Sequence, residues 1–251
     1  MVYLTEKKGR NCMSLSRTSL KYLAAAAMLL DHIAAFVLMR GNEPGLYDLF
    51  RMIGRLTAPV MCYFLAAGFQ HTSSLKRYVL RLAVFAAVSQ PAFVFARFGA
   101  GWPRHLFSEG NMLVTLLLSL LMLAGITRAG TSAGRIAAAA GAVLLSLFCD
   151  WGGYGPLMVL VFYMLRSQPK KMWLTYSLLA VCCWGGAAAA AVSSGEAWYL
   201  SLWNGGMLLA VPLLKCYDGT RGSGSKFNKW FFYVFYPAHL AVLGGIRFAV
   251  V

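Results

Sequence analysis

Two residues whose side chains can bind and release protons are adjacent inside an apolar stretch of the sequence. Asp31 and His32 fall past the middle of residues 20–39, a stretch with the length of a membrane-spanning helix. A carboxylate at that depth costs about 2.5 to 3.5 kcal/mol, so we expect Asp31 to face protein or water instead of lipid. Histidine titrates near neutral pH and serves as a general acid or base. The pair therefore predicts either a functional site or a structural contact that locks the first helix to its neighbours.

Four more pairs of polar residues lie at the ends of other apolar segments. Within each pair the residues are three or four positions apart, which places them on one face where the chain is helical. The pairs are Arg51 with Arg55, Asn111 with Thr115, Tyr236 with His239 and, around a turn, Asp150 with Tyr154. A structural interpretation exists for these residues as well, since arginine reaches lipid head groups and tyrosine belongs to interfacial aromatic belts.

The elements that position these residues are apolar segments of helical length. Of the 251 residues, 59% are hydrophobic and only 12% are charged, which is more apolar surface than one soluble core can bury. We therefore predict an all-α, polytopic transmembrane helical bundle, with a polar cytoplasmic tail at residues 1–19 and a single membrane domain at residues 20–251. The nine predicted spans cover residues 20–39, 51–70, 78–95, 111–126, 136–149, 154–165, 172–192, 198–214 and 230–249.

Local signals refine this prediction. Residues 40–50 are rich in turn-forming and acidic residues and predict a loop, and Ser89, Gln90 and Pro91 are expected to break the outer part of the third span. The six cysteines are scattered without a CxxC pair or a neighbouring histidine cluster, so we expect neither a disulfide framework nor a metal site.

Lysine and arginine are divided unequally between the two ends of these spans. One side carries 17 of the 23, and the other carries Arg40, Arg51, Arg55, Arg97, Arg104 and Arg247. The positive-inside rule then places the amino terminus in the cytoplasm and the carboxyl terminus outside. The net charge of +15 lies in short breaks between apolar runs, which indicates contact with the lipid bilayer and no nucleic-acid partner.

This orientation assigns a depth to each polar residue. Asp31, His32 and the four pairs come from five segments and all fall in the outer half of the membrane. Scattered structural polar residues have no reason to share a depth, so the common level favours a functional site. At the opposite, cytoplasmic end of the second span, His71 precedes a basic break with Lys76, Arg77 and Arg81, which suits an anionic ligand.

Seven segments of the sequence, taken in order, resemble the TraX family of integral-membrane proteins. They are KYL with MLLDHI, RMIGRLTAP, GFQHT with the basic run to RYVLRL, SQP, NMLVTL, DWGGYG and FYPAHL. The best-described members of that family acetylate the amino terminus of conjugative F-type pilin. The resemblance therefore implies a multi-pass protein of the cytoplasmic (inner) membrane that transfers an acetyl group from acetyl-CoA to an acceptor amine, on a pilin or another membrane or secreted protein.

The resemblance also implies roles for the polar residues. His32 suits the base that deprotonates the amine, Asp31 or Asp150 orients the ring or holds the ammonium, and His239 is the second candidate base. Arg55, Asn111 or Tyr236 donates to the carbonyl oxygen as it becomes an oxyanion. Thr115 and Tyr154 complete the substrate-binding set, and the basic residues His71, Lys76, Arg77 and Arg81 hold the anionic cosubstrate. A route through an acetylated histidine stays open.

Two other functions compete with this interpretation. A proton-coupled transporter or flippase also places ionisable residues inside the membrane, but such carriers often show internal repeats and need access from both sides. The sequence has no repeat and no acidic cluster in the inner half, which favours the enzyme. A membrane O-acyltransferase that acts on a sugar or a lipid is the second alternative.

Overall fold

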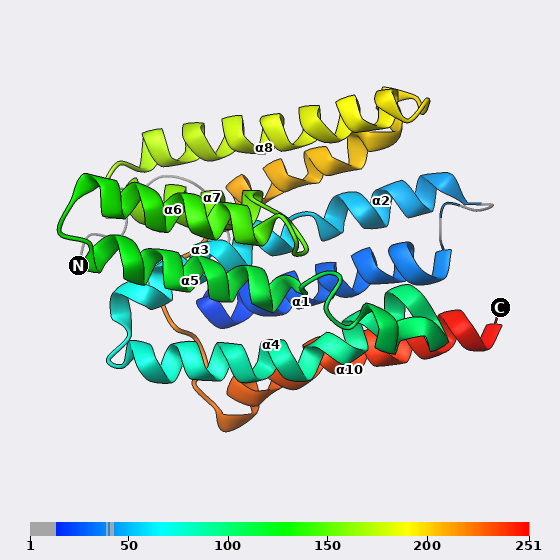
Figure 1. Cartoon of the computed structure of the whole chain (residues 1–251), viewed down its shortest axis with the longest axis horizontal. Coiled ribbons are helices and arrows are strands. Elements are labelled where there is room, and N and C mark those ends of the chain that lie inside the picture. The colour runs from blue at the N-terminus through cyan, green and yellow to red at the C-terminus, as the bar shows by residue number, and fades with distance from the viewer. Residues whose placement is uncertain (1–13, 39, 41–42, 251) are drawn as a thin grey trace. The chain divides into compact units, whose positions relative to one another are not determined.

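The computed structural model describes residues 14–38, 40 and 43–250, which form helices joined by short turns (Figure 1). Two isolated β-bridges are the strand-like pairings within this described part of the chain. The predicted all-α class is confirmed. The part of the predicted tail before residue 14, the end of the first predicted span at residue 39, and residues 41–42 of the predicted loop lie outside the described residues.

Five helical segments are long and apolar enough to cross a membrane: Arg17–Leu38, Pro44–His71, Leu75–His105, Pro169–Ser193 and Trp230–Ala249. Three shorter apolar helices, Met112–Arg128, Ser132–Ser146 and Tyr154–Met164, accompany them. The chain is therefore a multi-pass membrane protein. The count of nine spans, their orientation and the division into a tail and one membrane domain stay predictions.

Packing divides the chain into two compact units. Among the described residues, unit 1 comprises those within 1–61 and 165–232, and unit 2 comprises those within 62–164 and 233–251. The chain passes from one unit to the other within α3 (Thr57–His71), after residue 164, and within α10 (Lys226–Val250).

Unit 1 is built around α2 (Pro44–Gly54), which packs on α1 (Arg17–Ile33) and on the π-helix η1 (Ala34–Leu38) that continues it. The opposite neighbour of α2 is the 3₁₀-helix η3 (Trp198–Leu209), which is followed by α9 (Ala210–Lys215). The long helix α8 (Pro169–Ser193) runs beside η3 (Figure 1). The helix α1 with its continuation η1, and the 3₁₀-helix η3 from a distant part of the chain, therefore meet around α2.

The start of the described chain is pinned to the loop after α9 in unit 1. The backbone N–H of Leu15 donates to the carbonyl of Cys216 at 2.9 Å, and that of Arg17 donates to Thr220 at 2.9 Å. Ser16 caps α1 by accepting a hydrogen bond from the backbone of Ser19. Cys216 is disulfide-bonded, a bond that the scattered cysteines did not predict.

Unit 2 is built around α5 (Met112–Arg128), which packs on α4 (Leu75–Phe98), α6 (Ser132–Ser146) and α7 (Tyr154–Met164). The short 3₁₀-helix η2 (Gly99–His105) follows α4. The part of α10 in this unit lies along α4 (Figure 1), where the rings of Phe85 and Tyr233 stack at 4.2 Å. Farther along, Gly244 allows α10 to approach Phe95 and Ala96.

Two local predictions are wrong, and a third segment differs from the expected helix type. The predicted loop at 40–50 contains most of α2, which starts at Pro44 because proline suits the first turn of a helix. The predicted break at Ser89, Gln90 and Pro91 is absent, and α4 continues through it, since a proline in a membrane helix removes one hydrogen bond that neighbouring groups replace. The eighth predicted span, 198–214, is a 3₁₀-helix over its first 12 residues.

Candidate functional site

A carboxylate and a guanidinium form a buried ion pair in unit 1. Oδ2 of Asp31 lies 2.8 Å from Nη1 of Arg51, and the two side chains are 15% and 14% exposed. Arg55, one turn farther along, also interacts electrostatically with Asp31. The sequence left open whether Asp31 serves His32 or a neighbouring helix, and the structure pairs it with α2. Two guanidiniums and one carboxylate together carry one net positive charge.

The ion pair depends on a glycine in α2. A Cβ atom at Gly54 would collide with the side chain of Asp31, so α1 and α2 approach each other through this glycine. Arg51 lies one turn before Gly54, and Arg55 follows it directly as the C-terminal cap of α2. The short sequence RMIGR therefore supplies both cations and the space into which the carboxylate fits.

A tryptophan that the sequence did not single out completes this cluster. The guanidinium carbons of Arg51 and Arg55 lie 4.4 and 4.2 Å from the ring centroid of Trp203 in η3. A guanidinium within about 6 Å of an indole is attracted by the ring's negative face. An apolar residue within a predicted span carries no signal that sets it apart from lipid-facing or core residues, which is why the prediction missed Trp203. We call Asp31, Arg51, Arg55 and Trp203 the charged cluster.

The backbone departs from α-helical geometry on every element that supplies the charged cluster. The α1 helix changes into a π-helix at Ala34, directly after Asp31, His32 and Ile33. The second segment is broken between Gly54 and Thr57, and Trp203 lies in a 3₁₀-helix. Such irregularities concentrate at functional sites, and broken helices mark substrate sites in membrane proteins.

The ion pair of Asp31 and Arg51 retains hydrogen-bonding capacity. Oδ1 of Asp31 and Nε of Arg51 are buried and have no hydrogen-bond partner among the residues that the structure describes. A buried polar atom without a partner costs about 1 to 3 kcal/mol, more when it is charged. The neighbouring His32 is half-buried, and its ring lies 5.5 Å from that of Phe36. The cluster thus offers an acceptor and a donor, and a candidate base, His32, directly follows Asp31 in the chain.

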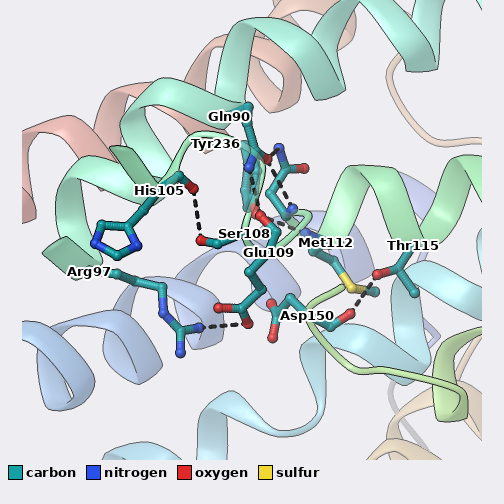
Figure 2. Close-up of polar contacts among 10 residues, drawn as sticks. Gln90, Arg97, His105, Ser108, Glu109, Met112, Thr115, Asp150 and Tyr236 are labelled. Atoms are coloured by element: carbon teal, nitrogen blue, oxygen red, sulfur yellow. Dashed lines mark hydrogen bonds and ion pairs between the residues drawn. The ribbon is translucent and has the colours of Figure 1, made fainter. Parts of the chain in front are cut away.

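In unit 2, the amide of Gln90 holds the loop before α5 against α4 (Figure 2). Its Nε2 donates to the carbonyls of Leu106 and Glu109 at 3.0 and 2.6 Å, and its Oε1 accepts from the backbone and side chain of Asn111 at 3.1 and 2.8 Å. Asn111 also donates to the carbonyl of Ala86 at 2.8 Å and accepts from the Leu113 backbone as the cap of α5. Both amide hydrogens of Asn111 are therefore used inside the protein.

Other predicted residues join the same end of α5 (Figure 2). The hydroxyl of Thr115 donates to the backbone carbonyl of Asp150 at 2.5 Å, and the Tyr236 hydroxyl accepts a hydrogen bond from the Met112 backbone at 3.3 Å. Thr115 is fully buried and Tyr236 is almost so. Unit 2 thus brings Asn111, Thr115, Asp150 and Tyr236 together, whereas Gln90, which bonds Asn111 and the loop before it, was predicted only as a helix breaker.

His239 is buried in α10 one turn beyond Phe235. Its Nδ1 lies 2.7 Å from the Phe235 carbonyl oxygen, and the two rings stack at 4.7 Å. Since a carbonyl only accepts, Nδ1 carries the hydrogen, and in the neutral ring Nε2 is then the atom that accepts a proton. Tyr154, the remaining predicted substrate-binding residue, begins α7 and is half-buried.

Comparison with known proteins supports the family resemblance of the seven sequence segments. The model of the family described as TraX protein matches residues 16–247. The chain belongs to the TraX family. This confirms the resemblance read from the sequence, and the match contains the charged cluster, the Gln90 linkage and His239.

A curated relative of this TraX-family chain comes from Dichelobacter nodosus and is named probable fimbrial assembly protein FimC, serogroup H1. It is 31% identical over 239 residues, which cover 91% of this chain and 94% of the relative. No solved structure matches the chain.

The basic residues that the sequence assigned to an anionic ligand lie at the junction of α3 and α4 in unit 2 of this TraX-family protein. His71 ends α3, and the side chains of Lys76, Arg77 and Arg81 in the first turns of α4 are exposed. The guanidinium of Arg81 also lies 5.6 Å from the ring of Tyr78. Exposed cations of this kind attract anions, and their assignment to a cosubstrate stays a prediction.

Proposed function

We propose that this TraX-family protein is an integral-membrane acetyltransferase that moves an acetyl group from acetyl-CoA to an acceptor amine. The observation that carries the proposal is the largely buried charged cluster, whose Asp31 directly precedes His32 in the chain, at a point where the helices of unit 1 depart from regular geometry. Ionisable residues inside membrane segments are costly and by default mark functional sites. Membership of the TraX family supports acetyl transfer as the chemistry.

The first requirement of the reaction is an uncharged amine. An α-amino group has a pKa of about 7.7 to 8.0, so it is mostly protonated at neutral pH and needs a base. We assign that role to His32: the ammonium first loses one proton through the imidazole to water, and the imidazole then takes a second proton as the neutral amine attacks the thioester carbonyl. Oδ1 of Asp31 has no hydrogen-bond partner in the described part of the chain, and we assign to it the incoming ammonium. His239, whose Nε2 is the accepting atom of the neutral ring, is the second candidate base.

The second requirement is stabilisation of the oxyanion that forms on the acetyl carbonyl. Arg51 and Arg55 supply more positive charge than Asp31 neutralises, and we assign the oxyanion to these guanidiniums. Collapse of the tetrahedral intermediate breaks the carbon–sulfur bond, and the proton taken from the amine is returned to the departing CoA thiolate. Each role requires only groups that the charged cluster and His32 contain.

The remaining predicted residues receive supporting roles. We assign substrate binding to Asp150, Tyr154 and Tyr236, while Asn111 and Thr115 contribute by holding the start of α5, because the hydrogens of the Asn111 amide and the Thr115 hydroxyl are used inside the protein. The exposed group His71, Lys76, Arg77 and Arg81 is assigned to the phosphate groups of CoA, which are anions of the cytoplasm.

The acceptor that we propose is the free amino terminus of a pilin-type subunit, and the site of action is the cytoplasmic membrane. Two findings support this choice. The best-described TraX proteins acetylate a pilin amino terminus, and the curated relative bears a name that refers to fimbrial assembly.

The decisive experiment is acetyl transfer by the purified protein. The detergent-solubilised chain is incubated with radiolabelled acetyl-CoA and a peptide that has the amino-terminal sequence of a pilin from the same cell. We expect label on the free-amine peptide and none on the same peptide with a formylated amino terminus. Transfer to neither peptide contradicts the pilin assignment, and a hydroxylamine-labile product points to O-acylation instead.

A proton-coupled transporter is the second candidate, because a helix broken at ionisable residues is also typical of secondary transporters. Liposomes that contain the protein and a trapped pH-sensitive dye distinguish the two functions. Proton flux that depends on Asp31, in a preparation that transfers no acetyl group, favours the transporter. Acetyl transfer without such flux favours the enzyme.

A further inference from the structure

One side chain, Trp203, contacts both cations of the charged cluster. We propose that Trp203 is a positioning residue, which holds Arg51 and Arg55 in the orientation that the reaction needs. This inference rests on the proposed function and assigns a role to a residue outside the predicted site.

The two arginines need a partner between them because their charges repel. They are four residues apart, and like charges at that spacing on a helix destabilise each other. The indole of Trp203 lies 4.4 Å from one guanidinium and 4.2 Å from the other, so a single ring attracts both. Asp31 neutralises one positive charge of the cluster, and Trp203 stabilises the pair without neutralising the second. The surplus charge stays available for an oxyanion.

Trp203 itself is held firmly by the elements on either side. A Cβ atom at Gly206, three residues farther along η3, would collide with the backbone carbonyl of Met52, so η3 lies directly against the turn of α2 between the two arginines. The Tyr176 hydroxyl of α8 donates to the Met207 carbonyl at 2.6 Å, and the Asn204 amide donates to the Ser201 carbonyl at 3.1 Å. The η3 backbone that carries Trp203 is therefore fixed relative to α2.

The variants that test the proposal differ in whether an aromatic face is kept. W203F keeps a ring with a negative face, whereas W203L and W203M fill much of the space without one. The matched control is W198L in the same 3₁₀-helix, because Trp198 is 56% exposed and its ring contact is with Tyr199. Thermal unfolding in detergent identifies which variants are folded before any other measurement is made.

The kinetic measurement separates positioning from binding. In W203L or W203M we expect kcat for acetyl transfer to fall about 10- to 100-fold, with the KM for acetyl-CoA unchanged, because disordered arginines stabilise the oxyanion less well. W203F is expected to stay within about threefold of the wild type and W198L to match it, since both keep an aromatic face beside the arginines.

A second measurement does not depend on acetyl transfer. Phenylglyoxal modifies arginines that leave their contacts, and peptide mass spectrometry reports the rates at Arg51 and Arg55. We expect those rates to rise about 3- to 30-fold in W203L and to stay unchanged in W203F and W198L. Unchanged rates in folded W203L and W203M overturn the proposal. A wild type that transfers no acetyl group defeats the proposed function alone, because the arginine rates still test the positioning role.

Discussion

Asp31 illustrates how one residue connects the stability of this protein with its proposed chemistry. Its carboxylate is largely removed from solvent, and one oxygen is paired with Arg51 while the other has no hydrogen-bond partner in the described chain. A pair of this kind is weak evidence for stability by itself, because desolvation opposes the attraction between the charges. The unused oxygen is better explained by a substrate that donates to it.

The contributions of Asp31 and Arg51 to the free energy of unfolding should nevertheless be coupled. Asp31→Asn leaves two guanidiniums without a counter-charge, so we expect the free energy of unfolding to fall by about 3 kcal/mol, and Arg51→Gln should have a similar effect. The double variant D31N/R51Q should lose clearly less than the sum of the two. Unfolding in detergent measures all three.

The control for this cycle is Asp48→Asn, which breaks the pair between Arg40 and Asp48. Those side chains are 29% and 37% exposed, so we expect a loss of only about 0 to 1 kcal/mol. Strictly additive losses in D31N and R51Q would show that the two charges are not coupled.

His32 should matter for transfer and not for folding. His32→Ala removes the proposed base, so acetyl transfer should fall about 10²- to 10⁴-fold, while the half-buried side chain leaves little packing to lose. His239→Ala is the comparison, because it tests the second candidate base. Full activity in H32A together with a large loss in H239A would transfer the role to His239.

The sequence predicts only part of this residue-scale arrangement. A carboxylate at membrane depth has to find a partner, and the face shared by Arg51 and Arg55 follows from their spacing. The choice of partner, the second cation contact at Trp203 and the network around Gln90 are set by close approach between distant segments. No local pattern carries that information, because a glycine that admits a neighbouring helix looks like any other glycine in the sequence.

At the scale of elements, two glycines allow the backbones of unit 1 to approach each other. Gly54 receives the side chain of Asp31 from α1, and Gly206 receives the backbone of Met52 from α2. Two predicted span starts fall at observed helix starts, at Asn111, which caps α5, and at Tyr154, where α7 begins. The 3₁₀ geometry of η3 could not be predicted, because an almost uniformly apolar segment shows no periodicity that distinguishes 3.0 from 3.6 residues per turn.

Alanine substitutions at glycines with a close neighbour, compared with glycines without one, test this packing. Gly54→Ala forces its new methyl group into Asp31, and Gly206→Ala forces one into the backbone of Met52, so we expect each to destabilise the protein by about 1 to 3 kcal/mol. Gly45→Ala and Gly205→Ala are the matched controls, because a Cβ atom there meets nothing within 4 Å. Equal unfolding temperatures for G54A and G45A would contradict the close approach of α1 and α2.

At the scale of the whole molecule, charge asymmetry is the strongest signal in the sequence. Apolar composition predicts a multi-pass protein, which the long helical segments bear out, and 17 of 23 basic residues are predicted to lie on one side. Composition reports little about how a chain packs, and the division into two units has no counterpart in the hydropathy of the sequence. The orientation of the chain in the membrane is predicted from the basic residues and needs its own test.

Cysteine labelling from outside the cell measures the orientation. Gly130, between α5 and α6, and Gly101, in η2, both have open space where a Cβ atom would be added, so G130C and G101C should fold normally. We expect a membrane-impermeant maleimide to label G101C in intact cells and G130C only after permeabilisation, with the wild type as the blank for native cysteines. Basic residues flank Gly130 on the predicted cytoplasmic side.

The labelling result decides between two features of the chain, the basic residues and a disulfide, that predict opposite orientations in the membrane. Cys216 lies on the side that the basic residues place in the cytoplasm, yet it is disulfide-bonded, a state typical of oxidising compartments. We expect the charge bias to prevail, because many basic residues contribute to it and a single disulfide does not set topology. Labelling of G130C but not G101C in intact cells would invert the orientation, place Cys216 outside, and move the basic residues of α4 away from cytoplasmic CoA.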